Sequence, residues 1–352
     1  MIKASIKYRE FKFRLPATTS RGTLHSKSVY YIVLYEDSNP FESGIGECSL
    51  FPGLSMDDTE GFVEKLKEIV DLINQGWYNL KTPVPGFPSI NFALEIAIKD
   101  LESKGSKILF PSEFTEGKMP VRINGLIWMG SKNDIIRQID EKLNEGFTCV
   151  KMKIGALDFD EEYEILASLR KRYKKEDLEI RLDANGAFPA DEALEYLYRL
   201  SDLSVHSVEQ PILPSQLEEM AALCETTPIP VALDEELIGK YPIENKRQLL
   251  KMIKPQYIVL KPGLLGGLKS CEEWIQVAED SNIGWWITSA LETNIGLNAI
   301  AQWTFTLKNK MAQGLGTGTL FENNIDSPLA VAGEKLYYFP RKKWDLSLFT
   351  SK

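Results

Sequence analysis

Three acidic residues stand at the ends of three successive apolar runs of the sequence. They are Asp183 in RLDANGAF, Glu209 in SVEQPI and Asp234 in ALDEEL, about 25 residues apart. One such carboxylate on its own would be interpreted first as a helix cap, but three in succession indicate a shared site. Three converging anions need protons or a cation, and an all-oxygen ligand set suits Mg²⁺, with Mn²⁺ as a substitute.

Lysines occupy positions where apolar residues normally pack. Lys151 and Lys153 in VKMKIG are two residues apart, so on a strand both amines project to the same side. Burial and mutual repulsion disfavour the charged forms, which makes a neutral amine accessible as a general base. Lys261 in VLKPGLLGG is expected at the opposite side of the same mouth, as a second acid or as a cation facing the substrate. Simple pairing with the acidic cluster, or capping of a loop, is the structural alternative.

A repeated strand and helix pattern from about residue 121 would position these side chains. The predicted strands are Val121–Trp128, Thr148–Ile154, Leu178–Asp183, Ser204–Glu209, Pro230–Asp234, Tyr257–Lys261, Gly284–Ser289 and Met311–Gly314. The predicted helices between them include Asn133–Asn144, Phe159–Arg172, Ala190–Leu200, Gln216–Cys224 and Leu268–Asp280. Eight such strands indicate a barrel, whose parallel strands deliver their C-terminal residues to one mouth.

The rest of the chain has a different pattern. The first part, 1–115, shows strand-like alternation through Tyr35, a turn-rich piece Glu36–Pro52, and helical stretches Met56–Gln75 and Ser89–Lys104. We therefore predict an α+β capping domain over 1–115 and a barrel with the active site over 116–320. The tail, 321–352, holds the apolar segments Leu336–Tyr338 and Trp344–Phe349 and is expected to pack back on the cap.

Composition excludes several classes of function. The net charge of −9 repels polyanions, so no nucleic-acid partner is expected, and no run approaches the ~18 apolar residues of a membrane-spanning helix. Four separated cysteines without a C-x-x-C pair favour a reducing cytoplasm. Two isolated histidines disfavour a Ser-His-Asp hydrolase and a histidine-rich zinc site.

The ordered set of barrel residues resembles the enolase superfamily and, within it, the muconate-lactonizing-like subgroup. The matching residues are Lys151, Lys153, Asp183, Glu209, Asp234 and Lys261, and the stretch Gly44–Leu54 is similar to a part of the family's capping domain that contributes an active-site loop. The resemblance implies a (β/α)₇β TIM-type barrel with an N-terminal α+β cap completed by the C-terminal tail. It also implies Mg²⁺ on the three carboxylates, Lys153 as the acid/base, Lys151 as a contact of the substrate carboxylate, and an enediolate intermediate.

The segment ITSALETNIGL after the seventh strand is similar to the S-x-x-E-x-x-x-G-L run of o-succinylbenzoate synthases. This similarity implies Mg-dependent syn dehydration of a succinyl-hydroxycyclohexadiene carboxylate to 2-succinylbenzoate in menaquinone biosynthesis. Candidate contacts of the succinyl tail are Ser20, Ser289, Gly316 and Thr317.

Other activities of the subgroup stay open. A dipeptide epimerase or an N-succinylamino acid racemase would use Lys153 and Lys261 on opposite faces of one α-carbon. The segment GLGTGTLFENN lacks the Asp-x-Asp motif of dipeptide epimerases, which favours the synthase. A barrel that only binds a carboxylate ligand is the alternative without catalysis.

Overall fold

The first three strands form an antiparallel sheet, called the cap sheet here. The structure is a computed structural model that describes residues 1–19 and 22–350 of the chain. Strands β1 (Ile2–Thr19), β2 (Gly22–Glu36) and β3 (Asn39–Cys48) pair in that order. The alternation that predicts the first two strands is confirmed. The prediction of a turn-rich Glu36–Pro52 is wrong over most of its length, because that stretch contains β3.

One face of the cap sheet packs on two helices, α1 (Phe62–Asn74) and α2 (Pro88–Glu102). Both helices fall where the sequence predicts them. Gly46 of β3 lets α2 lie directly on the sheet, since a Cβ at this position would stand 1.8 Å from the carbonyl oxygen of Ala93. The glycines of this segment therefore serve close packing inside a strand rather than a turn.

The other face of the cap sheet joins a second apolar core that the barrel and the tail complete. This core contains Phe11 and Tyr31 from the sheet, Leu264 and Ala290 from the barrel, and Phe349 from the tail. The rings of Tyr31 and Phe349 lie edge to face with centroids 5.1 Å apart. The cap sheet is thus sandwiched between its own helices and the mouth of the barrel.

Seven parallel strands form the barrel wall in the order β5 to β11. They are β5 (Gly125–Ile127), β6 (Cys149–Lys153), β7 (Glu179–Asp183), β8 (Ser207–Glu209), β9 (Val231–Leu233), β10 (Tyr257–Leu260) and β11 (Gly284–Ile287). The predicted eighth strand is reduced to two parallel bridges, Ile123 with Gln313 and Thr288 with Gly314. These bridges connect the two edges of the sheet and close the ring, as the predicted fold class requires.

Helices surround this wall. They are α3 (Lys132–Asn144), α4 (Phe159–Arg172), α5 (Ala193–Ser201), α6 (Leu217–Thr226), α7 (Ile243–Ile253), α8 (Pro262–Leu265), α9 (Leu268–Asp280) and α10 (Asn294–Thr306), with the short 3₁₀ turns η1 (Glu235–Leu237) and η2 (Gly316–Thr319). In α4, Asp158 caps the first turn by accepting from the backbone N–H of Asp160, and Arg170–Arg172 lie in the last turn. These charges complement the helix dipole, which explains why this predicted helix has the observed bounds.

The tail divides between the barrel and the cap sheet. Strands β12 (Leu329–Ala332) and β13 (Lys335–Tyr338) form an antiparallel sheet with β4 (Val121–Arg122), which precedes the barrel wall. The short helix α11 (Ser347–Thr350) brings Phe349 to the cap sheet. Of the two tail segments expected on the cap, Leu336–Tyr338 therefore pairs elsewhere, whereas Trp344–Phe349 contributes to the core beside the cap sheet.

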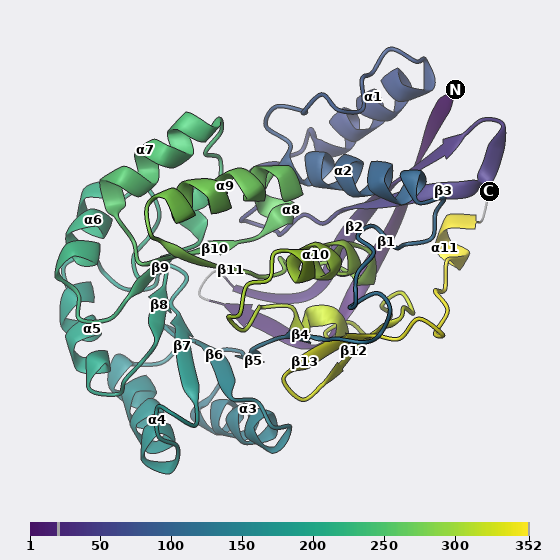
Figure 1. Ribbon diagram of the computed structural model, residues 1–352. Coiled ribbons are helices and arrows are strands. Elements are labelled where there is room, and N and C mark those ends of the chain that lie inside the picture. The colour runs from purple at the N-terminus through teal and green to yellow at the C-terminus, as the bar shows by residue number, and fades with distance from the viewer. Residues whose placement is uncertain (20–21, 351–352) are drawn as a thin grey trace.

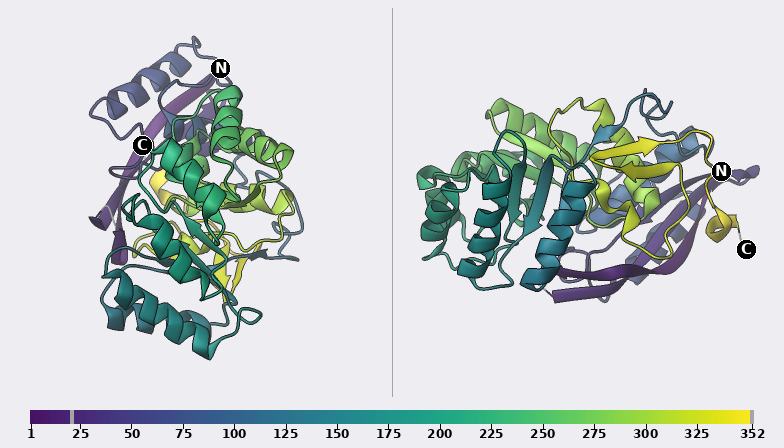
Figure 2. Two further views of the ribbon diagram at one scale, coloured as in Figure 1. Left: turned by 90° about the vertical axis from the view of Figure 1, so that its left-hand side faces the viewer. Right: turned by 90° about the horizontal axis from the view of Figure 1, so that it is seen from below.

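The outer helices α4 to α7 lie on the side of the molecule away from both termini (Figure 1). The right-hand view of Figure 2 agrees, with these helices opposite the cap strands and the C-terminal segment. None of the helices in the described part of the chain has the length and apolar character needed to cross a membrane. The division into 1–115, 116–320 and 321–352 stays a prediction.

Candidate active site

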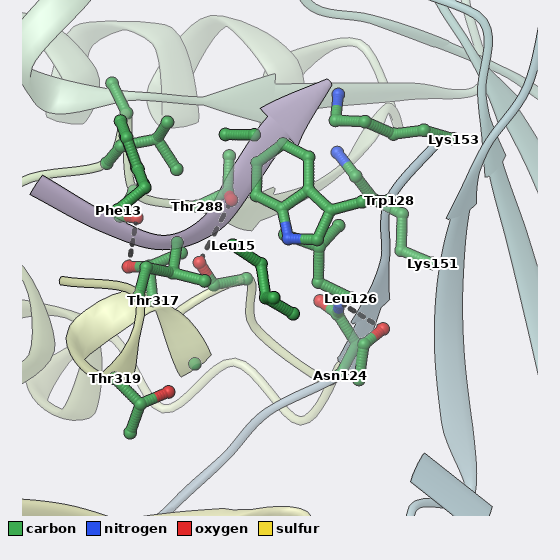
Figure 3. Close-up of a pocket in the computed structure, with 18 of the residues that line it drawn as sticks. Phe13, Leu15, Asn124, Leu126, Trp128, Lys151, Lys153, Thr288, Thr317 and Thr319 are labelled. Atoms are coloured by element: carbon green, nitrogen blue, oxygen red, sulfur yellow. Dashed lines mark hydrogen bonds between the residues drawn. The ribbon is translucent and has the colours of Figure 1, made fainter. Parts of the chain in front are cut away.

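Two lysines project from β6 into the mouth of the barrel. Lys151 and Lys153 alternate with Met152 along the strand, so their amines share one side, and Figure 3 shows both pointing into the pocket. Their exposed fractions are 7% and 8%. The sequence prediction that both amines are buried on the same side of the strand agrees with this placement.

Three carboxylates lie on the neighbouring strands. Asp183 ends β7, Glu209 ends β8, and Asp234 directly follows β9. The strand register pairs Lys153 with Asp183 and Asp183 with Glu209, which sets these residues side by side across three strands. All three carboxylates are almost fully buried. The structure therefore brings together the acidic residues that the sequence singles out.

Ammonium groups link these carboxylates in a chain. The Nζ of Lys151 lies 2.7 and 2.8 Å from the two carboxylate oxygens of Glu209 and 2.8 Å from Oδ2 of Asp183. The Nζ of Lys153 lies 3.0 Å from the same Oδ2 and donates to Oδ1 of Asn185 at 2.7 Å. With Lys261, three lysine amines face three carboxylates in a region that water barely reaches.

Lys261 closes the chain from the far side of the mouth. It follows β10, four strands along the wall from β6, and forms an ion pair with Asp234. Its Nζ is 3.9 Å from Oε1 of Glu209. Lysines from β6 and from the end of β10 thus contact the same group of carboxylates.

The surroundings separate the pKa values of the lysines. Burial would lower the pKa of Lys151, but Asp183, Glu209 and Asp234 outweigh this effect and raise it. Burial also lowers the pKa of Lys153, and there Lys151 and Lys261 add to the lowering against the pull of Asp183, so its pKa ends below the ordinary value. A neutral amine is therefore more accessible at Lys153 than at Lys151.

The carboxylates are shifted in opposite directions. Burial would raise the pKa of Asp183, but the ammonium groups of Lys151, Lys153 and Lys261 hold it well below its usual range. Burial and the charge of Asp183 raise the pKa of Glu209 to about 8, against the effect of Lys151. Repulsion between adjacent anions is the physical reason for this divergence, and a cation placed among them would relieve it.

The donor set fits a hard divalent cation, since it consists of carboxylate oxygens without histidine or cysteine. In the described residues no three such side chains surround a single point closely enough to hold a metal ion. Instead, lysine amines contact oxygens of all three carboxylates. A metal ion held by these carboxylates would displace some of these lysine contacts.

A pocket of about 260 Å³ lies beside these groups. Its wall includes Lys151, Lys153, Lys261 and Asn185, together with apolar side chains of the cap sheet and the barrel such as Phe13, Leu15 and Trp128 (Figure 3). The amine of Lys153 lies 5.9 Å from the centre of the Trp128 ring. A ligand with both an anionic and an apolar part matches this lining.

The predicted contacts of the succinyl tail have different outcomes. Ser289, Gly316 and Thr317 all line the pocket, and the hydroxyls of Ser289 and Thr317 form a hydrogen bond with each other. The structure thus brings these three residues to one wall. Ser20 lies outside the described residues.

Sequence reasoning missed two polar residues, Asn185 and Gln210, that form hydrogen bonds around the lysines and carboxylates. Asn185 accepts from Lys153 and donates to Oε1 of Glu235 at 3.0 Å. Gln210 accepts from the backbone N–H of Asp234 at 3.2 Å and of Glu236 at 3.3 Å. Each of these polar residues comes one or two positions after a predicted carboxylate, and this position next to strand ends is the signal that could have identified them.

Comparison with known proteins assigns the family. Residues 134–337 match the family described as enolase C-terminal domain-like. The chain belongs to the enolase superfamily. Its members depend on a divalent metal, which agrees with the all-oxygen donor set of this barrel.

Individual members of the enolase superfamily resemble the chain over different shares of its length. An o-succinylbenzoate synthase of Desulfotalea psychrophila is 44% identical, over 94% of this chain and 98% of the relative. The crystal structure of MenC from Desulfotalea psychrophila superposes with a TM-score of 0.85 at 40% identity, covering 96% of this chain and 99% of that one. An N-succinylamino acid racemase of Thermus thermophilus is 28% identical over 61% of this chain and 56% of the relative.

Proposed function

We propose that this member of the enolase superfamily is an o-succinylbenzoate synthase, a hydro-lyase of menaquinone biosynthesis. The observation that carries the proposal is the 44% identity to a relative of that name over almost the full length of both chains. The pair of buried lysines facing a third lysine across three carboxylates supports it, because proton abstraction next to a carboxylate needs a base and a stabilised negative charge. The substrate is a small carboxylate, a succinyl-hydroxycyclohexadiene carboxylate.

Lys153 acts as the base and then as the acid in this proposal. Its amine, with a lowered pKa, takes the proton α to the substrate carboxylate, and the enediolate that results expels the 6-hydroxyl group. The same amine returns the proton to the departing hydroxyl, so a single lysine suffices for syn elimination. Asn185 orients the amine by accepting one of its hydrogen bonds.

The other two lysines remain charged. The carboxylates around Lys151 raise its pKa, so it contributes a fixed positive charge for the carboxylate of the substrate. Lys261 keeps its charge for the same reason, with Asp234 as its main partner, and faces the ring that becomes aromatic. Their roles are binding and electrostatic stabilisation.

Asp183, Glu209 and Asp234 would hold Mg²⁺, for which Mn²⁺ can substitute. When bound, the cation supplies positive charge beside the substrate carboxylate and makes the α-proton more acidic. The succinyl tail would lie along the wall that contains Ser289, Gly316 and Thr317. We also infer a cytoplasmic location, which the four free, buried cysteines support.

The decisive experiment measures turnover of the cyclohexadiene substrate by the rise in aromatic absorbance, with saturating Mg²⁺ and with EDTA. Formation of o-succinylbenzoate only with the metal supports the proposal. No turnover at saturating Mg²⁺ contradicts it. Dipeptides and N-succinylamino acids incubated in D₂O then test the epimerase and racemase alternatives, which predict α-deuteration with inversion. A barrel that binds without catalysis would be inactive toward every one of these substrates.

A further inference from the structure

A second group of buried charged side chains lies where the cap sheet meets the loop after β11. Lys27 of β2, Glu47 of β3 and Glu292 of that loop are each at most 1% exposed. The proton transfer proposed above does not use them. Because burying a charge is unfavourable unless specific partners compensate, this cluster requires a reason.

Lys27 holds the backbone of the loop. Its Nζ donates to the carbonyl oxygens of Ala290 at 2.7 Å and Leu291 at 3.0 Å. Both of these residues line the pocket, and so does Phe51, whose ring centre lies 5.8 Å from the same amine. Leu291 has a φ of +61°, a left-handed conformation that a leucine adopts only when its surroundings enforce it. The ammonium group therefore sits directly behind the pocket wall.

Glu47 holds the beginning of α10. Its carboxylate accepts from the backbone N–H of Thr293 at 2.8 Å, from the Thr293 hydroxyl at 2.6 Å and from the N–H of Gly296 at 2.7 Å. A carboxylate supplied by β3 thus caps a barrel helix, where the helix dipole favours negative charge. Gly296 makes room for both acidic residues, since a Cβ there would lie 2.8 Å from Cγ of Glu292 and 3.0 Å from Oε2 of Glu47.

Glu292 completes the cluster from within the loop. Its Oε2 accepts from the backbone N–H of Ala290 at 2.6 Å, while its Oε1 is buried without a hydrogen-bond partner in the described part of the chain. Oε1 lies close to Gly263, which is two residues after Lys261: a Cβ at Gly263 would stand 2.7 Å from this oxygen. Burial raises the pKa of Glu292 to about 7, against the effect of Lys27, and lowers the pKa of Lys27 to about 8. The three groups thus share one desolvated environment.

We propose that Lys27, Glu47 and Glu292 are positioning residues through which the cap sheet fixes the backbone of residues 290–296, and with it the pocket wall at Ser289. A shift of this loop would move the Ser289 hydroxyl away from Thr317 and enlarge the pocket where it contacts the substrate tail. Loss of the cluster is therefore expected to weaken ligand binding more than proton transfer. The inference rests on the proposed function for the identity of the ligand.

The test compares the wild type with Lys27→Met and Lys27→Arg. Lys27→Met leaves two buried carbonyls without their donor, and we expect KM and the Kd of o-succinylbenzoate to rise about tenfold or more with a smaller change in kcat. Lys27→Arg keeps the charge and the donors and is expected to recover much of this loss. Hydrogen exchange followed by mass spectrometry should show faster exchange at Thr293 and Gly296 in Lys27→Met.

Lys246→Met is the matched control. Lys246 is a fully buried lysine that donates to the carbonyl oxygen of Ser270 at 2.8 Å, but it lies on α7 and does not line the pocket. Its replacement should lower the melting temperature while leaving KM and the exchange of residues 293–296 unchanged. If Lys27→Met fails to fold, Glu47→Gln takes its place with the same expectations.

The inference is overturned if the folded Lys27→Met or Glu47→Gln variant keeps the KM, the product Kd and the exchange of the wild type. The exchange measurement needs no substrate. If the wild type turns over no cyclohexadiene substrate, the proposed function fails, and faster or unchanged exchange at residues 293–296 still decides whether the cluster positions the loop.

Discussion

Replacing Lys153 by methionine removes the amine and keeps an unbranched side chain of similar length in the pocket. The amine lies 3.0 Å from Oδ2 of Asp183 and 2.7 Å from Oδ1 of Asn185, so the substitution also removes one of three cations from a group with three carboxylates. The remaining lysines, Lys151 and Lys261, still contact the three carboxylates. Activity and metal affinity should therefore change in different ways.

The expected loss of activity follows from the double use of the amine. Removing a positioned acid/base typically lowers the rate by about 10² to 10⁴, which is roughly 3 to 5 kcal/mol of activation free energy. Since Lys153 both takes and returns the proton in the proposed mechanism, we expect a decrease in kcat of at least about 10². The affinity for Mg²⁺ should be kept or increased, because an amine that competes with the metal ion for Oδ2 of Asp183 has been removed.

Dehydration is measured by aromatic absorbance, Mg²⁺ binding by calorimetry and the folded fraction by circular dichroism. Lys246→Met serves as the control, because it also removes a buried lysine with a carboxylate partner, Glu273 at 2.8 Å, but away from the pocket. Its kcat should equal that of the wild type. The reasoning is refuted if folded Lys153→Met retains more than a tenth of the kcat, or if it loses Mg²⁺ binding together with activity.

Three further predictions concern the metal, the loop after β11 and the cap. Asp183→Asn removes a charge from the carboxylate set and should weaken Mg²⁺ binding by more than tenfold in calorimetry; unchanged affinity would remove Asp183 from the metal site. Burial raises the folded pKa of Glu292 from 4.5 to about 7, so its contribution to stability is present below about pH 4.5 and lost as the pH rises through about 7. Chemical denaturation should then show the wild type losing on the order of 3 kcal/mol relative to Glu292→Gln over this range, whereas a constant difference would contradict the shift. Gly46→Ala places a Cβ 1.8 Å from the carbonyl oxygen of Ala93 and should destabilise the chain by about 1 to 3 kcal/mol or more, and an unchanged melting temperature would argue against this close contact.

The barrel strands and the residues at their ends could be predicted from the sequence because both follow from local periodicity. Apolar runs of strand length locate β6 to β10, and parallel strands in one wall bring Lys153, Asp183 and Glu209 to the same mouth. The positions two residues apart on β6 likewise determine that Lys151 and Lys153 share a side. These inferences need no knowledge of contacts between distant segments.

What the sequence did not reveal depends on such distant contacts. The glycines of β3 resemble turn signals, but Gly46 is required by the approach of α2, which local composition does not show. The pairing of β13 with β12 and β4, rather than with the cap sheet, depends on which strand edge is free in the folded chain. The hydrogen bond from Asn185 to Glu235 joins the loop after β7 to η1, and the two residues are 50 positions apart. Periodicity carries no information about such a pair.

The apolar core shared by Tyr31, Phe349, Leu264 and Ala290 also limits how the molecule can open. If the cap sheet swung away as a rigid lid, it would expose these side chains to water, at a cost that grows with the apolar area uncovered. We therefore expect substrate entry and product release to require only small movements at the rim of the barrel mouth, while the cap sheet stays packed on the barrel. The residues at the rim of the mouth, rather than a hinge between the cap sheet and the barrel, therefore control the entry of substrate and the release of product.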